Sequence, residues 1–355
     1  MTKSNLHATL TSLLPEIEFL QEVPLAPLTT VKIGGPAEVF CQVTTQAQFI
    51  QVVQVAKQNH MPLTILGSGS NVLIADRGIR GLVVINMVQG IQVLAQIPPQ
   101  PMKVVDSTRW QTIQPPVLNQ LEKAVGQEKL NRIRVRIESG TLLGWTINKL
   151  LNQGITGLEW FAKIPGTIGG AIVNNSHGGH YYIGQFVESA TVVDKTGQII
   201  TLNQNQLEFD YDFSRFHSTK EIIIYADFLL FRGNADQAKQ ILSKWSKQKA
   251  HQPQNSLGCV FKNLSEDEQQ AQNLSSPSIG YVVDQILHLK GTQIGDAKIS
   301  DKHGAFIENL GQATASDYLE LIRKIIHQSQ AQLNLKLKPE IIFLGFTPEE
   351  LAGII

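Results

Sequence analysis

Two glycine-rich segments of this sequence have the residue types that bind anions. The first, LGSGSN (66–71), follows a short apolar run. Its alternating glycines and serines allow backbone N–H groups and the Ser68 and Ser70 hydroxyls to converge on an anion. The segment lacks the third glycine of a Rossmann fingerprint and the lysine of a Walker motif, so neither phosphate-binding motif is present. A plain tight turn is the alternative interpretation.

The second segment, IPGTIGGAIVNN (164–175), combines one proline with three glycines. Pro165 fixes its own φ, and the glycines permit close backbone approach to a flat or extended ligand. A β-bulge or a sharp bend is the alternative. Two separated glycine turns suit a dinucleotide, with one turn at the pyrophosphate and the other along a ring system.

A third segment, SLGCVFKN (256–263), carries the groups that could react. Gly258 would expose the neighbouring Cys259, while Lys262 offers a cation and Asn263 an amide. A lone cysteine is usually structural, and that remains the alternative here. The other cysteine, Cys41, falls in an expected strand and is interpreted as a buried structural thiol. The histidines near the three segments lack the spacing of metal ligands, so we expect no metal site.

Composition limits the classes of function. The chain has 355 residues, 42% hydrophobic, with 30 basic and 30 acidic side chains. This length predicts two or three packed units, and the balanced charge argues against a protein that coats nucleic acid. No stretch approaches the roughly 18 apolar residues of a membrane span, and the N-terminus lacks a signal-peptide pattern. We therefore expect a cytoplasmic protein without membrane insertion.

Apolar periodicity predicts the elements that position the glycine segments. Alternating or short apolar runs predict strands, and apolar residues at helical spacing predict helices. The predicted strands are 37–44, 63–66, 81–86, 132–139 and the string PEIIFLG near the C-terminus. The predicted helices are one capped by Thr45, then about 142–153 and 234–250, one through Ile279–Ile286, and one through Tyr318–Ile326.

The same pattern predicts the organisation of the chain. A leader segment (1–28) precedes a strand-rich domain (29–233), and a composition shift near Gly233 marks the start of a smaller C-terminal α/β domain (234–355). The proline-rich stretch 98–131 is interpreted as a surface insertion, and the polar stretch 265–278 as a loop-like insertion. The predicted fold class is α+β.

Six strings occur in the order found in one known family. They are TTVKIGGPAE (29–38), LGSGSNVLIAD (66–76), GLEWFAKIPGTIGGAIVNN (157–175), GCVFKN (258–263), LKGTQIGDAKISDKHGAFIENLG (289–311) and LKPEIIFLG (337–345). The chain thereby resembles the UDP-N-acetylenolpyruvoylglucosamine reductases, also called UDP-N-acetylmuramate dehydrogenases or the MurB family. The resemblance covers nearly the whole chain, from about residue 29 to 345.

The resemblance implies a fold and a reaction. The fold is an FAD-binding module of the PCMH or vanillyl-alcohol-oxidase type, followed by a substrate-binding C-terminal domain. NADPH reduces non-covalently bound FAD, which then delivers a hydride to C3 of the enolpyruvyl group of a UDP-sugar, and a proton is added at C2. The product is UDP-N-acetylmuramate, a precursor of peptidoglycan.

The resemblance also implies roles for particular residues. The family has a serine as the proton donor where this chain has Cys259, and a thiol is ordinarily a stronger acid than an alcohol. Glu340 falls on the family's carboxylate, and Lys262 and Asn263 fall at the substrate. The implied FAD-binding residues are Gly67, Ser68, Gly69, Ser70, Asn71, Ile164, Pro165, Gly166, Thr167, Gly169 and Gly170.

One departure from the family pattern bears on catalysis. The family has an arginine that holds the substrate carboxylate where this chain has Asp212. We expect Arg215 or Lys262 to supply the missing cation, with Asp212 turned to solvent or paired with Arg215. Two alternatives remain: a homologue that binds FAD or the UDP-sugar with weak or no turnover, and a flavin oxidase that acts on another substrate.

Overall fold

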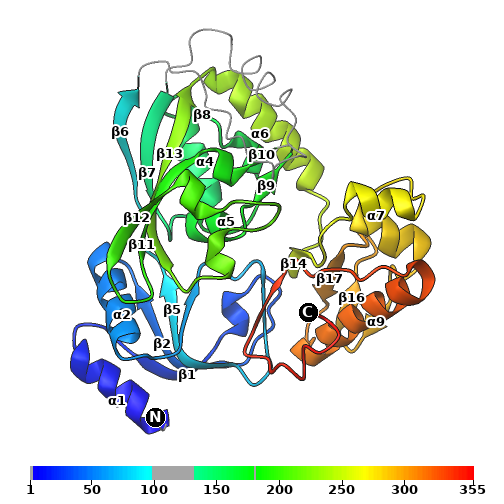
Figure 1. The fold of residues 1–355 in the computed structure, drawn as a ribbon, viewed down its shortest axis with the longest axis horizontal. Helices are drawn as coiled ribbons and strands as arrows, with labels where there is room; N and C mark the ends of the chain where they lie inside the picture. The colour runs from blue at the N-terminus through cyan, green and yellow to red at the C-terminus, as the bar shows by residue number, and fades with distance from the viewer. Residues whose placement is uncertain (1–2, 98–131, 180) are drawn as a thin grey trace.

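The computed structural model describes residues 3–97, 132–179 and 181–355 (Figure 1). The predicted insertion 98–131 therefore lies outside the described residues. A sheet near the N-terminus has the strand order β1 (Leu20–Pro24), β2 (Pro36–Val43), β5 (Ile79–Asn86) and β3 (Leu63–Leu66). Strands β2, β5 and β3 are parallel. Helices α1 (Lys3–Leu13) and α2 (Gln46–Gln58) pack against one side of this sheet through a shared apolar cluster.

Helix α2 forms as the sequence predicts. The Thr45 side chain accepts a hydrogen bond from the Gln48 N–H, which satisfies one of the free N–H groups at the helix start. The predicted apolar positions are all buried: Phe49, Val52, Val53 and Ala56. The connection after α2 then leads through β3 directly into the first glycine segment.

A second, antiparallel sheet follows, with the order β12 (Ile199–Asn203), β11 (Val187–Val193), β13 (Ile222–Arg232), β7 (Arg132–Glu138) and β6 (Ile91–Ile97). The predicted alternation in β7 is confirmed, because Ile133, Val135 and Ile137 are buried between half-buried neighbours. Strand β8 (Ile155–Thr156) pairs with the end of β13. The elements around this sheet are α4 (Leu143–Leu151), α5 (Ile168–Val173), β9 (His177–Gly178) and β10 (Tyr181–Tyr182). Short 3-10 helices lie at Glu159–Phe161, Ile183–Gln185, Gln204–Leu207 and Arg215–His217, and another lies between β1 and β2 at Ala26–Leu28.

Helix α6 (Ala235–Lys249) leads into a third sheet with the order β14 (Ser256–Cys259), β17 (Phe306–Asn309), β16 (Ala297–Ile299) and β15 (Gln293–Ile294). Helix α9 (Ala315–Leu333) covers this sheet and buries the predicted apolar stripe from Tyr318 to Ile326. The helix expected through Ile279–Ile286 forms as a short α-helix, α8 (Ile279–Tyr281), continued by a π-helix (Val282–Ile286).

The interpretation of 265–278 as a loop is wrong for part of the segment. Helix α7 (Glu266–Ala271) lies within it. The Ser265 hydroxyl accepts a hydrogen bond from the Glu268 N–H, while the Glu268 carboxylate accepts one from the Ser265 N–H. This reciprocal capping box stabilises a polar helix whose exposed surface has no apolar stripe to reveal it.

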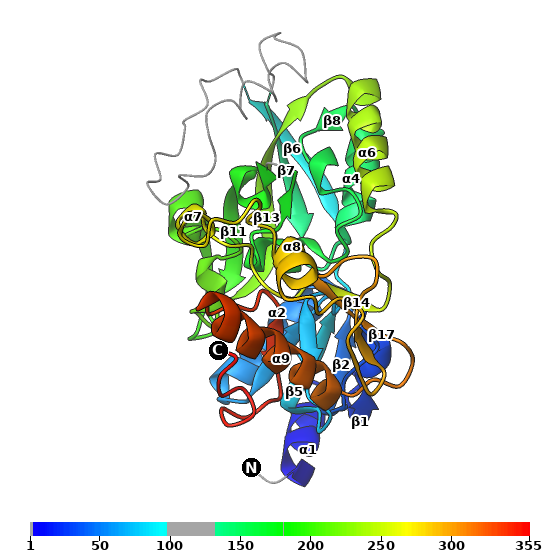
Figure 2. The ribbon, with the colours of Figure 1, turned by 90° about the vertical axis from the view of Figure 1, so that its right-hand side faces the viewer.

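The C-terminal part of the chain contacts the N-terminal part at several places. Strand β18 (Ile342–Leu344) pairs in parallel with β4 (Val72–Ile74). In both views the C-terminal segment, drawn in red, lies beside the N-terminal sheet, drawn in blue (Figures 1 and 2). Asp76, two residues beyond β4, accepts hydrogen bonds from the N–H groups of Ala315 at 2.7 Å and Ser316 at 3.1 Å. A carboxylate of one part thereby caps helix α9 of the other.

We expect the substitution Asp76→Ala to lower the free energy of unfolding by about 1–2 kcal/mol, because it leaves two N–H groups at the start of α9 without their partner. Urea unfolding followed by circular dichroism measures this change. Asp301→Ala is the matched control, since Asp301 is an exposed aspartate that pairs only with Lys298 in the described structure, and we expect a change below about 0.5 kcal/mol. Equal losses in the two variants would contradict the capping role.

Candidate active site

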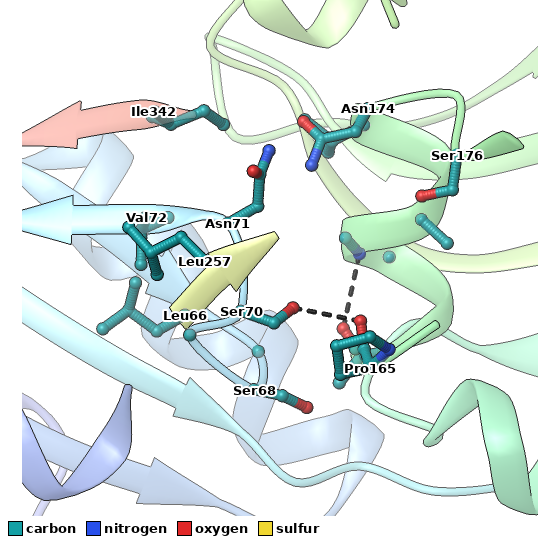
Figure 3. Close-up of a pocket in the computed structure, with 18 of the residues that line it drawn as sticks. Leu66, Ser68, Ser70, Asn71, Val72, Pro165, Asn174, Ser176, Leu257 and Ile342 are labelled. Atoms are coloured by element: carbon teal, nitrogen blue, oxygen red, sulfur yellow. Dashed lines mark hydrogen bonds between the residues drawn. The ribbon is translucent and has the colours of Figure 1, made fainter. Parts of the chain in front are cut away.

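All three glycine-rich segments meet at one cavity of about 1590 Å³ (Figure 3). It lies where the loop after β3, the segment before α5, strand β14 and the approach to β18 come together. Every predicted FAD-binding residue lines it, and so do Cys259, Asn263 and Glu340. Residues as far apart in sequence as Asn71 and Glu340, which are 269 positions apart, therefore contribute to one site.

The first two glycine segments touch each other at the wall of this cavity. The Ser70 hydroxyl donates a hydrogen bond to the Pro165 carbonyl at 3.0 Å (Figure 3). A Cβ on Gly67 would lie 2.5 Å from Thr167 Oγ1, and one on Gly69 would lie 2.4 Å from the Leu28 carbonyl. A side chain at Gly67 would push the two segments apart, and one at Gly69 would collide with the backbone at Leu28.

Both glycine segments offer backbone donors to a ligand. In the described structure, the backbone N–H groups of Ser68, Gly69 and Ser70 donate to no other protein group. The N–H of Gly169 is occupied by the Ser139 carbonyl at 2.8 Å, and that of Gly170 by Thr167 Oγ1 at 3.3 Å. The N–H groups of Gly166 and Thr167, in contrast, donate to no protein group in the part of the chain that the structure describes. Both segments therefore supply free donors for an anion.

Glu340 is fixed beside the first segment by its own backbone. Its N–H donates to the Val260 carbonyl at 2.8 Å, and its carbonyl accepts from the Asn71 side chain at 3.3 Å. The Ile342 N–H donates to the Asn71 carbonyl at 2.9 Å, where the β4–β18 ladder begins. Glu340 thus lies between the strand that carries Cys259 and the turn that follows β3.

Burial disfavours the charged forms of both Cys259 and Glu340. Burial raises the pKa of the Cys259 thiol to about 12, with the Glu340 charge as a second cause. Burial also raises the pKa of the Glu340 carboxyl to about 8, with the nearby Asp212 charge as a second cause. From the sequence alone, the thiol has the ordinary pKa of a free cysteine. Burial makes Cys259 a weaker acid than a free cysteine.

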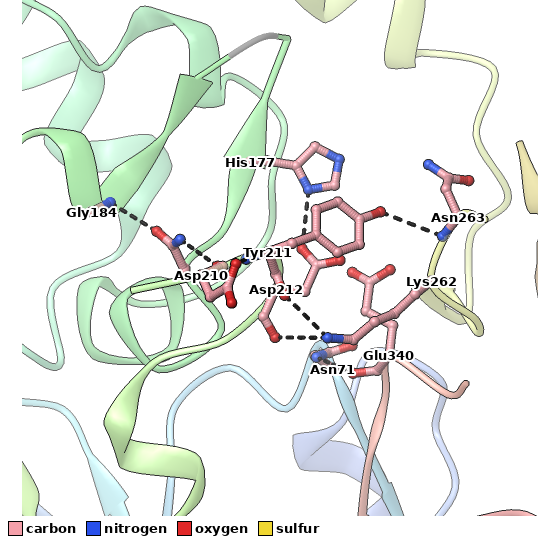
Figure 4. Close-up of polar contacts among 10 residues, drawn as sticks. Asn71, His177, Gly184, Asp210, Tyr211, Asp212, Lys262, Asn263 and Glu340 are labelled. Atoms are coloured by element: carbon pink, nitrogen blue, oxygen red, sulfur yellow. Dashed lines mark hydrogen bonds and ion pairs between the residues drawn. The ribbon is translucent and has the colours of Figure 1, made fainter. Parts of the chain in front are cut away.

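Asp212 differs from its predicted arrangement. The interpretation that it turns to solvent or pairs with Arg215 is wrong. Its side chain is only 4% exposed, and Oδ1 lies 3.2 Å from Nδ1 of His177 (Figure 4). The backbone has a positive φ of 44° here, which turns the carboxylate inward against the residues that follow α5.

Arg215 does not line the cavity. Its guanidinium makes two hydrogen bonds to the Glu221 carboxylate, at 2.9 and 3.0 Å, and its third nitrogen donates to the Gln206 carbonyl. A bidentate pair of this kind fixes the side chain. The geometry therefore gives no support to the catalytic role predicted for Arg215.

Lys262, like Arg215, is not among the residues that line the cavity. Its amino group donates to the carbonyls of Tyr211 and Asp212, at 3.2 and 3.3 Å (Figure 4). Asn263 lines the cavity, and its side-chain oxygen accepts a hydrogen bond from the Ile279 N–H at 3.0 Å. Lys262 positions the turn that contains Asp212, and its charge also lowers the pKa of Glu340.

His177, Trp245 and Lys249 are among the side chains of this cavity that the sequence did not identify. His177 lies in NNSHGG, where the sequence departs from the regular motif of the resembled family, and that departure was the available signal. Trp245 and Lys249 lie on the last turns of α6. A polar helix carries no sequence signal that it faces a cavity.

Comparisons with known proteins decide the family. Residues 249–344 match the model of the UDP-N-acetylenolpyruvoylglucosamine reductase C-terminal domain, and residues 37–105 and 117–203 match an FAD binding domain. The UDP-N-acetylenolpyruvoylglucosamine reductase of Clostridium novyi is 30% identical over 96% of this chain and 97% of its own. That of Lachnoclostridium phytofermentans is 31% identical over 91% of each chain.

The chain belongs to the UDP-N-acetylenolpyruvoylglucosamine reductase family. The solved reductase (MurB) of Thermus caldophilus is similar in fold, with a TM-score of 0.66 and 25% sequence identity over 92% of this chain and 98% of that one. The predicted fold class, an FAD-binding module followed by a MurB-type C-terminal domain, is confirmed. Among the helices of the described residues, none is long and apolar enough to cross a membrane. Nor do those residues contain a cluster of side chains suited to a metal ion.

The residues present fit FAD, the cofactor of this family. Free N–H donors at Ser68, Gly69 and Ser70 match the needs of a diphosphate. The glycines at 67 and 166 keep the cavity wall free of side chains, and Gly166 has a φ of 141° that other residues rarely adopt. Close backbone approach at these two positions leaves room for a flat ring system.

We expect the Cys259 thiol to react slowly with iodoacetamide, because only a thiolate reacts and a pKa of about 12 leaves very little thiolate at pH 8. The thiolate fraction is roughly a thousandfold below that of a free thiol. Mass spectrometry of the Cys41→Ser variant across pH 7–10 measures it, with free cysteine as the reference. A midpoint near the ordinary thiol value of about 8.5 would contradict this assignment.

Proposed function

We propose that this protein is a cytoplasmic, FAD-dependent enzyme that uses NADPH to reduce UDP-N-acetyl-3-O-(1-carboxyvinyl)-glucosamine to UDP-N-acetylmuramate. The observation that carries the proposal is the meeting of an anion-binding glycine turn with two acids of raised pKa, Cys259 and Glu340, at one cavity. The proposal keeps the division into a leader (1–28), an FAD-binding domain (29–233) and a substrate-binding domain (234–355). Its partners are small molecules, namely the UDP-sugar and NADPH.

FAD, when bound, carries a hydride from NADPH to C3 of the enolpyruvyl group. The chain binds it without a covalent bond, through the backbone of 67–71 and the close approach of 164–170. His177, the histidine nearest to the second segment, is held by Asp212 rather than left free for attachment. Acid precipitation of the purified yellow protein should therefore release all of its colour into the supernatant.

Cys259 is the proposed proton donor to C2. Gly258 has a φ of 82°, and a side chain added there would meet open space, so the backbone beside Cys259 is exposed to the cavity. The donor must be protonated before the reaction, and the raised pKa of Cys259 guarantees this at neutral pH. After transfer, the buried thiolate regains a proton because its charge is poorly solvated.

Glu340 is the proposed partner of the substrate carboxylate. Hydride addition places negative charge on C2 and, by resonance, on the adjacent carboxylate oxygens. A neutral carboxyl group can donate a hydrogen bond to those oxygens, whereas an ionised one would repel them. Asn71 and Val260 hold the Glu340 backbone, so the donor is in position before the charge develops.

A second candidate function, binding of the UDP-sugar with little turnover, is favoured by one observation. Asp212 puts a buried carboxylate close to Glu340, where an uncompensated negative charge would oppose the reaction. Steady-state oxidation of NADPH distinguishes the two candidates. Oxidation that depends on the enolpyruvyl sugar supports the reductase, and bound flavin that NADPH cannot reduce supports the binding protein.

We expect Cys259→Ser to retain substantial turnover, because a hydroxyl can also donate the proton. Cys259→Ala should still allow NADPH to reduce the bound flavin, while the transfer to the sugar slows about 100-fold or more. Stopped-flow absorbance measures the two half-reactions separately. An alanine variant that turns over at the parent rate would show that Cys259 is only structural.

We expect turnover to fall as pH rises through about 8, because Glu340 then loses its proton and repels the developing charge. Glu340→Gln keeps a hydrogen-bond donor and removes the titration, so its slower rate should stay level across the same range. The measurement is the turnover number at saturating substrate from pH 6 to 9.5. An equal decline in both proteins would assign the titration to another group.

A further inference from the structure

The cavity holds a charged pair that the proposed mechanism does not use. His177 and Asp212 lie 35 residues apart in sequence, and Nδ1 of the imidazole faces Oδ1 of the carboxylate at 3.2 Å. The imidazole lines the cavity and is 39% exposed, whereas the carboxylate is almost fully buried. The pair therefore has a buried carboxylate end and an imidazole end that a ligand can reach.

Hydrogen bonds from two further side chains, Asn175 and Ser214, hold this pair in place before any ligand binds. Just before His177, the Asn175 side chain donates to the Asp210 carbonyl at 2.7 Å and accepts from the Gly184 N–H at 3.0 Å (Figure 4). Beyond Asp212, the Ser214 hydroxyl donates to the Val173 carbonyl at 2.6 Å. Asn175 and Ser214 are fully buried. The turn that carries Asp212 is thus joined to the segment that carries His177 on both sides.

The surroundings favour the charged form of the imidazole. The hydrogen bond to Asp212 is the largest cause that raises the pKa of His177, and the charge of Asp212 raises it further. Burial and the charge of Lys249 act in the opposite direction. The rings of Tyr182 and Tyr211 lie beside the imidazole, with ring centres 5.7 and 6.2 Å away.

We propose that His177 is the cation that binds the carboxylate of the enolpyruvyl UDP-sugar, and that Asp212 is the positioning residue that holds its ring. The inference rests on the proposed function, which supplies a carboxylate-bearing substrate. His177, Asp212 and Glu340 gather around the Tyr211 ring, and the second imidazole nitrogen points away from Asp212 (Figure 4). That nitrogen can donate a charge-assisted hydrogen bond to a substrate carboxylate beside Glu340.

Pairing with His177 explains how a carboxylate, Asp212, can lie close to Cys259 and Glu340 in an active enzyme. Asp212 Oδ2 is buried and has no hydrogen-bond partner in the described structure. A lone carboxylate in that position would repel an anionic substrate. Paired with an imidazolium, its charge is balanced, and the pair presents the positive end of a dipole to the substrate. Lys249, which also lines the cavity, is the competing cation.

Calorimetric binding to the oxidised, FAD-loaded protein at pH 6 tests the inference, because without NADPH no turnover occurs. The two ligands are the carboxyvinyl UDP-sugar and UDP-N-acetylglucosamine, which lacks the carboxylate. We expect His177→Gln to weaken binding of the first ligand about tenfold or more, as for a lost charged hydrogen bond, and to leave the second within about twofold. Glu340 has a pKa of about 8 and stays neutral in this comparison.

Two variants serve as comparisons for His177→Gln. His217→Gln is the matched control, since His217 stacks on Phe213, hydrogen-bonds to the Ser214 backbone and does not line the cavity. We expect it to leave the ratio of the two affinities unchanged. Lys249→Gln tests the competing cation. If Lys249→Gln lowers the ratio and His177→Gln does not, the inference is overturned.

Nuclear magnetic resonance measures the pH midpoint of each histidine ring. Ligand binding would not change the midpoint of His177 if this residue had only a structural role. The pH midpoint of His177 should rise when the carboxyvinyl ligand binds and stay constant with UDP-N-acetylglucosamine. Asp212→Asn should lower that midpoint, because the hydrogen bond to a charged acceptor is lost. Identical midpoints in the two complexes would overturn the inference and leave the proposed function intact. A wild-type protein that binds neither ligand would overturn both.

Discussion

The parallel pairing of β18 with β4 is the constraint on which the site depends. It joins residues at opposite ends of the chain, and it begins where the Ile342 N–H meets the Asn71 carbonyl. The Asn71 side chain in turn holds the carbonyl of Glu340 across 269 positions of sequence. Without this ladder, the glycine turn would supply only N–H donors for an anion, and Glu340 would not be held beside it.

Burial sets the chemistry of the residues that this ladder brings together. Both Cys259 and Glu340 are held in a low-dielectric wall, which disfavours their charged forms and keeps their protons in place. An enzyme that adds a proton to a carbon needs such groups, because an ionised acid has nothing to donate. The pair of Asp212 and His177 lies at the same wall. When protonated, its imidazole supplies the positive charge that Cys259 and Glu340 lack.

The sequence predicts local structure well where one element decides it. Thr45 and the apolar stripe of α2 need no distant partner, and the glycines at 67 and 69 signal a close approach whatever lies opposite. The family resemblance then directs attention to Cys259 and Glu340, and both line the cavity. Helix α7 was predictable from the Ser265 and Glu268 capping box, but its lack of apolar residues concealed it.

Long-range electrostatics could not be predicted in the same way. Arg215 is the nearest cation to Asp212 in sequence, yet Glu221 holds it and a histidine 35 residues earlier takes its place. A positive φ at Asp212 turns the carboxylate inward, and sequence spacing carries no sign of this. The raised pKa values of Cys259 and Glu340 likewise follow from burial by segments that only the tertiary fold brings together.

The central claim is that one cavity couples flavin chemistry to protonation of the sugar. The most direct measurement is anaerobic mixing of the NADPH-reduced protein with the enolpyruvyl sugar in deuterated water. The account predicts that the yellow colour returns and that UDP-N-acetylmuramate forms in equal amount to the flavin, with one deuterium at C2. Colour that returns only when oxygen is admitted, with the sugar recovered unchanged, would contradict it.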